Sequence, residues 1–147
     1  MIRKLCVALV LSTLSALAFA AEHTVQMKNS GVDGIMVFEP GFLKVAVGDT
    51  VHFEPTDPGH NSESVAGLIP TGATPWKSDF GKKLSVKIDK NGVYVYECLP
   101  HSMLAMVGVI VAGDPINLAD IKKKAITLNA KFSMNKDRLN MYLAKVK

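Results

Sequence analysis

Cys98, His101 and Met106 lie within nine residues of one another, at the end of an apolar run typical of a β-strand. A thiolate, an imidazole and a thioether are donors that suit copper. A trigonal site of two histidines and one cysteine, with a weak axial methionine, is typical of blue-copper electron transfer. The segment therefore offers three of the four ligands of such a site, and a second histidine must come from elsewhere in the chain.

The second imidazole has three candidates, because the chain contains four histidines. His23 lies near the start of the predicted mature chain, where an exposed or frayed position is expected. His52 alternates with apolar neighbours, which is typical of a half-buried strand residue. His60 lies in a turn-rich segment, residues 57–61, and loops on a rigid scaffold often present ligands. A solvated role is commoner for a lone loop histidine, but the Cys98 cluster favours His60 as the missing ligand.

Two methionines compete for the axial position, and zinc competes with copper for the site. Met103 follows His101 by only two residues, which leaves little chain to curl around a metal, so we expect Met106 to bind and Met103 to border the site. Structural zinc sites often contain paired Cys-x-x-Cys elements, which this sequence lacks. The predicted ligands of one copper ion are His60, Cys98, His101 and Met106.

The first twenty residues predict a secretory signal peptide. Arg3 and Lys4 give a positively charged start, residues 5–17 form an apolar run, and residues 18–20 fit a small-x-small cleavage site. The run is too short to predict a membrane-spanning helix, so we expect no membrane insertion. Cleavage would leave residues 21–147 as one exported domain.

Cysteine usage supports a metal-binding role for Cys98. Cys6 lies inside the predicted signal, so Cys98 is the single cysteine of the mature chain. An unpaired cysteine in an oxidising compartment suggests an intermolecular disulfide or a functional thiol, and coordination would protect it from oxidation. The formal net charge of +4 falls to +2 when Arg3 and Lys4 leave. That mild charge, without clusters of alternating basic and aromatic residues, argues against nucleic-acid binding.

The main part of the chain predicts an all-β fold. Short β-branched and apolar runs separated by turn signals predict strands at residues 23–27, 42–47, 50–53, 84–88, 93–96 and 107–111. Asn91-Gly92 predicts a type I′ hairpin turn. This pattern indicates an antiparallel sandwich or barrel.

The C-terminal third predicts two helices. Asp114 as N-cap and Pro115 at the first helical position open a helix over residues 116–124. Its Lys122-Lys123-Lys124 run is expected to be a solvated face rather than a docking site. A second helix is expected to start near Ser133 or Asn135, with a buried stripe formed by Leu139, Tyr142, Leu143 and Val146.

The chain resembles the cupredoxins, most closely the pseudoazurins, over essentially the whole of residues 21–147. The matching pieces are Gly34-Ile35-Met36-Val37-Phe38-Glu39-Pro40, Val47-Gly48-Asp49-Thr50-Val51, Gly59-His60-Asn61, Ile69-Pro70, and Cys98-Leu99-Pro100-His101 with Met106. The resemblance implies a plastocyanin-like, Greek-key β-sandwich of about eight strands, with the two C-terminal α-helices packed on it.

The resemblance also implies a periplasmic, monomeric electron carrier with one type 1 copper ion, bound by His60, Cys98, His101 and Met106. It implies that the backbone N–H of Asn61 donates to the Cys98 sulfur and tunes the potential. The redox partners that it suggests are a nitrite reductase, a c-type cytochrome or a cytochrome c peroxidase.

The expected docking surface departs from the family pattern. Pseudoazurins commonly surround the exposed copper edge with lysines. This chain keeps Lys77 but has Ser30, Pro58 and Glu97 where basic residues are expected, and Trp76 where phenylalanine is more usual. These differences leave copper binding untouched and bear on partner choice.

Two other functions compete with electron transfer as interpretations of this sequence. In the predicted mechanism, electrons leave through His101, with Met36, Pro100 and Leu104 as an apolar docking patch around it. A copper chaperone or storage module is the alternative, but such proteins usually use exposed sites that release metal easily. An oxidase or reductase would need a second metal site, and the remaining histidines, His23 and His52, are not spaced as a pair.

Overall fold

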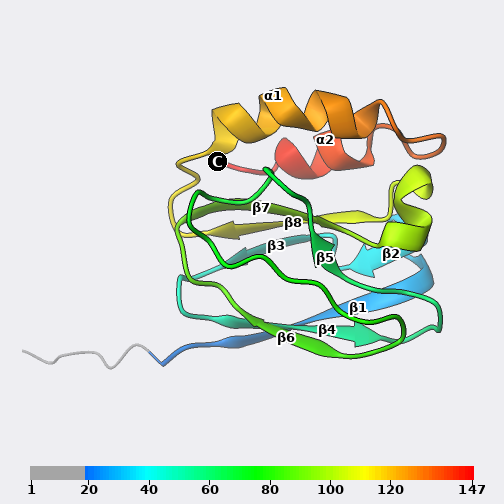
Figure 1. Ribbon diagram of the computed structural model, residues 1–147, viewed down its shortest axis with the longest axis horizontal. Helices are drawn as coiled ribbons and strands as arrows, with labels where there is room; N and C mark the ends of the chain where they lie inside the picture. Colours follow the sequence, from blue (N-terminus) through cyan, green and yellow to red (C-terminus); the bar gives the residue numbers. More distant parts are fainter. Residues whose placement is uncertain (1–18) are drawn as a thin grey trace, which may run out of the picture.

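The β-branched runs pair into two four-stranded sheets in the computed structural model, which describes residues 19–147 (Figure 1). The first sheet has the order β2 (Gly34–Glu39), β1 (Glu22–Gly31), β4 (Thr50–Pro55) and β6 (Leu84–Lys87). The second has the order β3 (Phe42–Val45), β8 (Val107–Ala112), β7 (Gly92–Glu97) and β5 (Glu63–Ser64). The predicted signal peptide, with Cys6, lies outside the described residues except for Phe19 and Ala20.

The strand pairing is mixed, whereas the sequence patterns predict an antiparallel sandwich. β1 runs parallel to β4, and β3 runs parallel to β8, while the other named pairs are antiparallel. Alternation of apolar and polar residues reports which face of a strand is buried, not the direction of its neighbour. The strand-dominated sandwich with two C-terminal helices is confirmed.

The prediction of a hairpin at Asn91-Gly92 is wrong, because the strands before and after this dipeptide belong to different sheets. β6 pairs with β4, and β7 pairs with β5 and β8. Gly92 has a positive φ of 134°, but Asn91 does not share it, so the two positive φ angles of a type I′ turn are absent. Gly92 serves close packing instead, since a Cβ there would lie 2.7 Å from the side-chain oxygen of Asn117.

The helices α1 (Leu118–Asn129) and α2 (Arg138–Leu143) begin later than predicted, and α1 also ends later. Asp114 and Pro115 form a turn before α1, in which their carbonyls accept from Ile116 and Leu118. Asn117 occupies the N-cap position, and its side chain hydrogen-bonds the backbone of Val93 on β7. The lysines at 122–124 are exposed as expected, and the four residues of the predicted stripe are buried, although Val146 lies beyond the end of α2.

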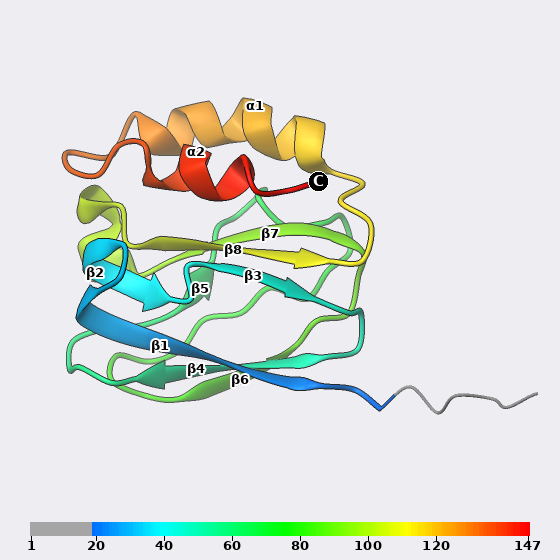
Figure 2. The same ribbon diagram turned by 180° about the vertical axis from the view of Figure 1, so that it is seen from behind.

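Two hydrophobic layers stabilise the molecule. One fills the space between the sheets, and the other lies between the second sheet and the helices, which cover that sheet (Figure 2). All six residues of β8 are buried, since one face of β8 contributes to each layer. Within residues 19–147, the structure has no helix with the length and apolarity needed to cross a membrane.

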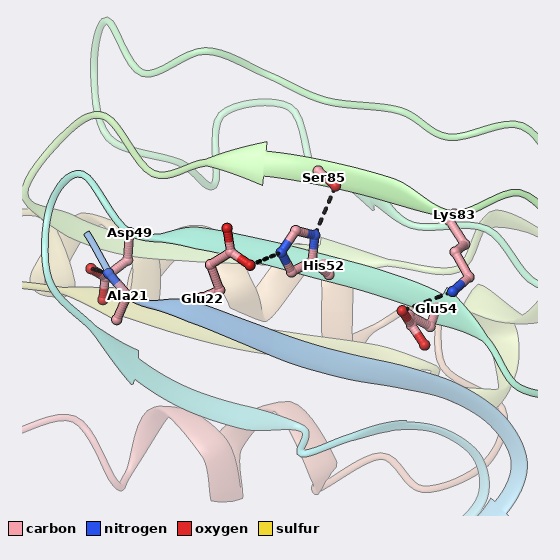
Figure 3. A network of polar contacts seen from close by, with 7 residues as sticks. All are labelled: Ala21, Glu22, Asp49, His52, Glu54, Lys83 and Ser85. Carbon is pink, nitrogen blue, oxygen red and sulfur yellow. Dashed lines mark hydrogen bonds and ion pairs between the residues drawn. The ribbon is translucent and has the colours of Figure 1, made fainter. Parts of the chain in front are cut away.

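Polar contacts along the first sheet account for the two histidines that were not predicted as ligands. His52 lies between Ser85 Oγ, at 2.8 Å from Nδ1, and Glu22 Oε2, at 3.3 Å from Nε2 (Figure 3). His23 is ordered rather than frayed, because its Nε2 lies 2.8 Å from Asp49 Oδ2. Asp49 also accepts from the backbone N–H of Ala21 at 2.8 Å, which fixes the start of β1 against β4.

Candidate metal centre

Three of the four predicted ligands converge at one end of the sandwich. The donor atoms of His60, Cys98 and His101 all lie within 4.8 Å of one another. The Cys98 Sγ is 3.8 Å from His60 Nδ1 and 3.4 Å from His101 Nδ1, and the two Nδ1 atoms are 3.2 Å apart. Among residues 19–147 this is the single group of metal-ligating side chains of this kind.

These separations fit a common metal ion. Metal–nitrogen and metal–sulfur bonds of about 2.0 and 2.3 Å, at trigonal angles, put the donors about 3.5–3.7 Å apart, close to the 3.2, 3.4 and 3.8 Å found here. One thiolate with two imidazoles is also the donor set that copper favours. The chemistry and the spacing of the three side chains therefore both suit copper.

The ligand loop joins β7 to β8. Cys98 follows β7 directly, and His101 lies in the short helix η1 (Leu99–Leu104), which Pro100 opens. His60 comes from the separate loop between β4 and β5, where its carbonyl accepts from Gly81 N at 2.8 Å. Backbone hydrogen bonds thus fix the segments that carry the donors.

Met106 closes the ligand loop. Its N–H donates to the His101 carbonyl at 3.2 Å, and its carbonyl accepts from Cys98 N at 2.9 Å. The side chain is fully buried in the same hydrophobic layer as Cys98. Met103, the competing axial candidate, is 63% exposed. The structure thus associates Met106 with Cys98 and leaves Met103 on the surface.

The orientation of His60 is fixed by a residue that the sequence patterns did not identify. His60 Nε2 lies 3.0 Å from Asn29 Oδ1. Because an amide oxygen only accepts, Nε2 carries the hydrogen and the Nδ1 lone pair faces Cys98. Asn29 gives no sequence signal of this role, because it is one of several polar residues on β1 and contacts His60 only through the tertiary fold.

Burial shifts the pKa of both buried donors, His60 and Cys98. Desolvation lowers the pKa of His60, and the nearby His101 lowers it further, while Asp57 opposes the change. The neutral imidazole that a metal needs is therefore favoured. Burial also raises the pKa of the Cys98 thiol, and the backbone N–H groups of Asn61 and His101 oppose this effect. The direction of the Asn61 effect is the one expected of the hydrogen bond to sulfur that the family resemblance implies.

Asn61 connects the two loops of the site. Its Oδ1 accepts from Leu99 N at 2.8 Å, and its Nδ2 donates to Glu63 at 3.1 Å. Glu63 also pairs with Lys77 at 3.2 Å. The loop that carries His60 is thereby held against the loop that carries Cys98.

The surface above the site is largely apolar. His101 is partly exposed, whereas His60 and Cys98 are fully buried. Leu99 is 47% exposed, and Pro100 is also exposed, beside the partly buried Leu104. The sequence patterns had not singled out Leu99, because its exposure depends on the conformation of η1.

Two of the four departures noted near the copper edge, Trp76 and Glu97, have partners within the protein. Trp76 is buried, stacks on Phe53 and donates from Nε1 to Ser62 Oγ at 3.0 Å. Glu97 accepts a hydrogen bond from Ser102 Oγ within the ligand loop. Trp76 therefore packs in the core, and the Glu97 carboxylate contacts the loop as well as facing solvent.

Two facing sheets with a His–Cys–His cluster at one end define a cupredoxin sandwich. The chain belongs to the plastocyanin/azurin family of copper-binding proteins, whose family model matches residues 25–113. Within that family it is similar to pseudoazurins, and it is a blue copper electron-transfer cupredoxin.

The similarity to pseudoazurins extends over most of the chain. A putative pseudoazurin of Rhizobium leguminosarum bv. viciae is 47% identical over 133 residues, which cover 90% of this chain and 84% of that protein. The crystal structure of pseudoazurin from Hyphomicrobium denitrificans matches with a TM-score of 0.77 and 42% identity, covering 86% of this chain and 99% of the other. Pseudoazurin from Methylobacterium extorquens AM1 matches with a TM-score of 0.73 and 39% identity, with the same coverage.

Proposed function

We propose that this chain is a periplasmic one-electron carrier whose type 1 copper ion is bound by His60, Cys98, His101 and Met106. The observation that carries the proposal is the convergence of three donors within 4.8 Å, beside the buried Met106. When bound, copper supplies one-electron chemistry by alternating between Cu(I) and Cu(II).

The protein contributes to this function by fixing the positions of the donor atoms. The backbone N–H of Cys98 donates to the Met106 carbonyl where β7 ends and β8 begins. His60 is held through its carbonyl by Gly81 N and through its Nε2 by Asn29 Oδ1. Donors fixed in this way rearrange little when the charge of the metal changes. A small rearrangement favours fast electron exchange.

Electrons are expected to leave through His101, the most exposed of the three converging donors. Leu99, Pro100 and Leu104 surround it with apolar surface, to which Met36 also contributes. An apolar contact of limited size suits short-lived association. The proposed partners are a nitrite reductase, a c-type cytochrome or a cytochrome c peroxidase, and the carrier acts as a monomer.

The proposed site supports transfer of electrons rather than catalysis by this chain. Four protein donors leave no coordination position for a substrate, whereas catalytic metal sites usually keep one open. A chaperone or storage role is the alternative. The buried Cys98 favours retention of the metal over its release.

Electron exchange with a c-type cytochrome tests the proposal. The reduced copper protein is mixed with oxidised cytochrome, and the zinc-loaded protein serves as a control without redox activity. The copper form should reduce the cytochrome with one electron per chain, while the zinc form should not. Rapid transfer of copper to a thiol peptide, without electron exchange, would instead favour the chaperone role.

Export is tested separately. The protein recovered from the periplasm of a bacterial host should begin at Ala21. Recovery of the full chain from the cytoplasm alone would contradict the localisation.

A further inference from the structure

Arg138, the first residue of α2, is the largest fully buried side chain among the described residues, with 1% of its surface exposed. Its guanidinium donates to four backbone carbonyls. Nη1 lies 2.8 Å from both Met36 O and Ala105 O, and Nη2 lies 3.0 Å from both Asp33 O and Ile35 O. No ion pair within residues 19–147 includes it. The charge is thus satisfied by the backbone of two separate segments: residues 33–36, at the start of β2, and Ala105 in the ligand loop.

Two of these carbonyls belong to residues with unusual backbone. Met36 has a φ of 49° and Ala105 a φ of 56°, both in the left-handed region that non-glycine residues seldom adopt. Such conformations persist where surrounding contacts hold them. Arg138 supplies one such contact to both residues through the same Nη1 atom.

The segment around Arg138 also holds the residues before Ala105. Three consecutive carbonyls of the ligand loop accept hydrogen bonds from the C-terminal segment. Met103 O accepts from Ser133 N at 2.8 Å, Leu104 O from Asn135 Nδ2 at 3.1 Å, and Ala105 O from Arg138. Residues 133–138 therefore hydrogen-bond the part of the ligand loop that comes immediately before Met106.

We propose that Arg138 is a positioning residue of the copper centre, which fixes the Met106 thioether by holding the Ala105 carbonyl against that of Met36. The inference rests on the proposed ligand set. An axial thioether bond is weak and long, so its length follows the protein backbone more than the metal. Met106 comes directly after Ala105, and a shift of that peptide moves the thioether.

Arg138→Lys and Arg138→Met test the proposal in the copper-loaded protein. Lysine keeps the charge but lacks the planar fork that reaches four carbonyls, and methionine removes every donor. Both variants should shift the visible absorption spectrum and the reduction potential. Copper affinity should fall about tenfold in Arg138→Met, as is typical when a group that orients a ligand is lost.

Leu139→Ala is the matched control. Leu139 is the next residue of α2 and is fully buried, but it makes no side-chain hydrogen bond to the ligand loop. It should lower the stability of the helical layer and leave the spectrum and the potential unchanged. Where Arg138→Met fails to fold, Asn135→Gly takes its place, because glycine tolerates the φ of 51° at that position while removing the bond to Leu104 O.

The outcomes separate this inference from the proposed function. A wild-type protein that is colourless with copper would contradict the proposed function itself. A blue wild type, with Arg138→Lys and Asn135→Gly unchanged in spectrum and potential, would overturn the positioning role alone. An equal spectral shift in Leu139→Ala would also overturn it, because general loosening of the helical layer would then explain the effect.

Discussion

His60 Nε2 lies 3.0 Å from Asn29 Oδ1, a contact between the loop after β4 and strand β1 of the same sheet. This contact sets which ring nitrogen carries the hydrogen. A residue outside the ligand loops thus prepares His60 to bind a metal through Nδ1.

Asn29→Leu should weaken copper binding about tenfold, because partners that orient a ligating histidine typically contribute this much or more. Asn29→Asp keeps an acceptor at the same place and should retain most of the affinity. Competition with a copper chelator measures both values. Equal affinity in wild type and Asn29→Leu would show that His60 needs no such partner.

Met106→Leu should keep copper bound and raise the reduction potential. Loss of the axial donor and a more apolar site disfavour the more highly charged Cu(II) form. Met103→Leu is the control, since Met103 is largely exposed. Redox titration of both variants measures the effect. A shift in Met103→Leu with none in Met106→Leu would reverse the axial assignment.

Asp49 should make the stability of the fold depend on acid pH. The hydrogen bond with His23, followed by those from the Ala46 and Ala21 backbone, lowers the pKa of Asp49 from 3.8 to about 2. A lowered folded-state pKa contributes stability that is complete above pH 3.8 and is lost as the pH falls towards about 2.

Asp49→Asn should therefore be less stable than the wild type near neutral pH, and the difference should shrink across that acid range. Urea unfolding of the metal-free proteins at a series of pH values measures the difference, so that contributions common to both proteins cancel. Two stability curves that stay parallel down to pH 2 would contradict this role.

Tyr94 and Tyr96 are both buried in β7, yet substitution by phenylalanine should have opposite effects on stability. The Tyr94 hydroxyl donates to Lys90 O at 2.8 Å and accepts from Lys90 N at 3.0 Å. The Tyr96 hydroxyl has no hydrogen-bond partner among the described residues. Tyr94→Phe should cost about 1–2 kcal/mol, whereas Tyr96→Phe should gain up to about 1 kcal/mol. Urea unfolding measures both, and a loss in Tyr96→Phe similar to that in Tyr94→Phe would show that its hydroxyl is satisfied.

The ligand loop was predictable because its donors are close in sequence and chemically distinctive. Cys98, His101 and Met106 share one short connection, and His60 stood out by its loop. Asn29 and Arg138 were not predictable in this way, because each acts through contacts with distant segments. An arginine at the start of a predicted helix gives no sign that its guanidinium will be buried.

The fold was predictable at the level of its elements and less so in their connections. Apolar alternation identified strands, but it carries no information on which strands pair. Asn91-Gly92 has the composition of a tight hairpin, yet the chain there passes from one sheet to the other. The late start of α1 follows from Asn117, whose side chain hydrogen-bonds β7.

Visible absorption of the purified protein with one equivalent of Cu(II) tests the central claim most directly. We expect an intense blue or blue-green colour that a mild reductant bleaches and that Cys98→Ser abolishes. A colourless copper complex, or a site that keeps zinc in the presence of excess copper, would contradict the account.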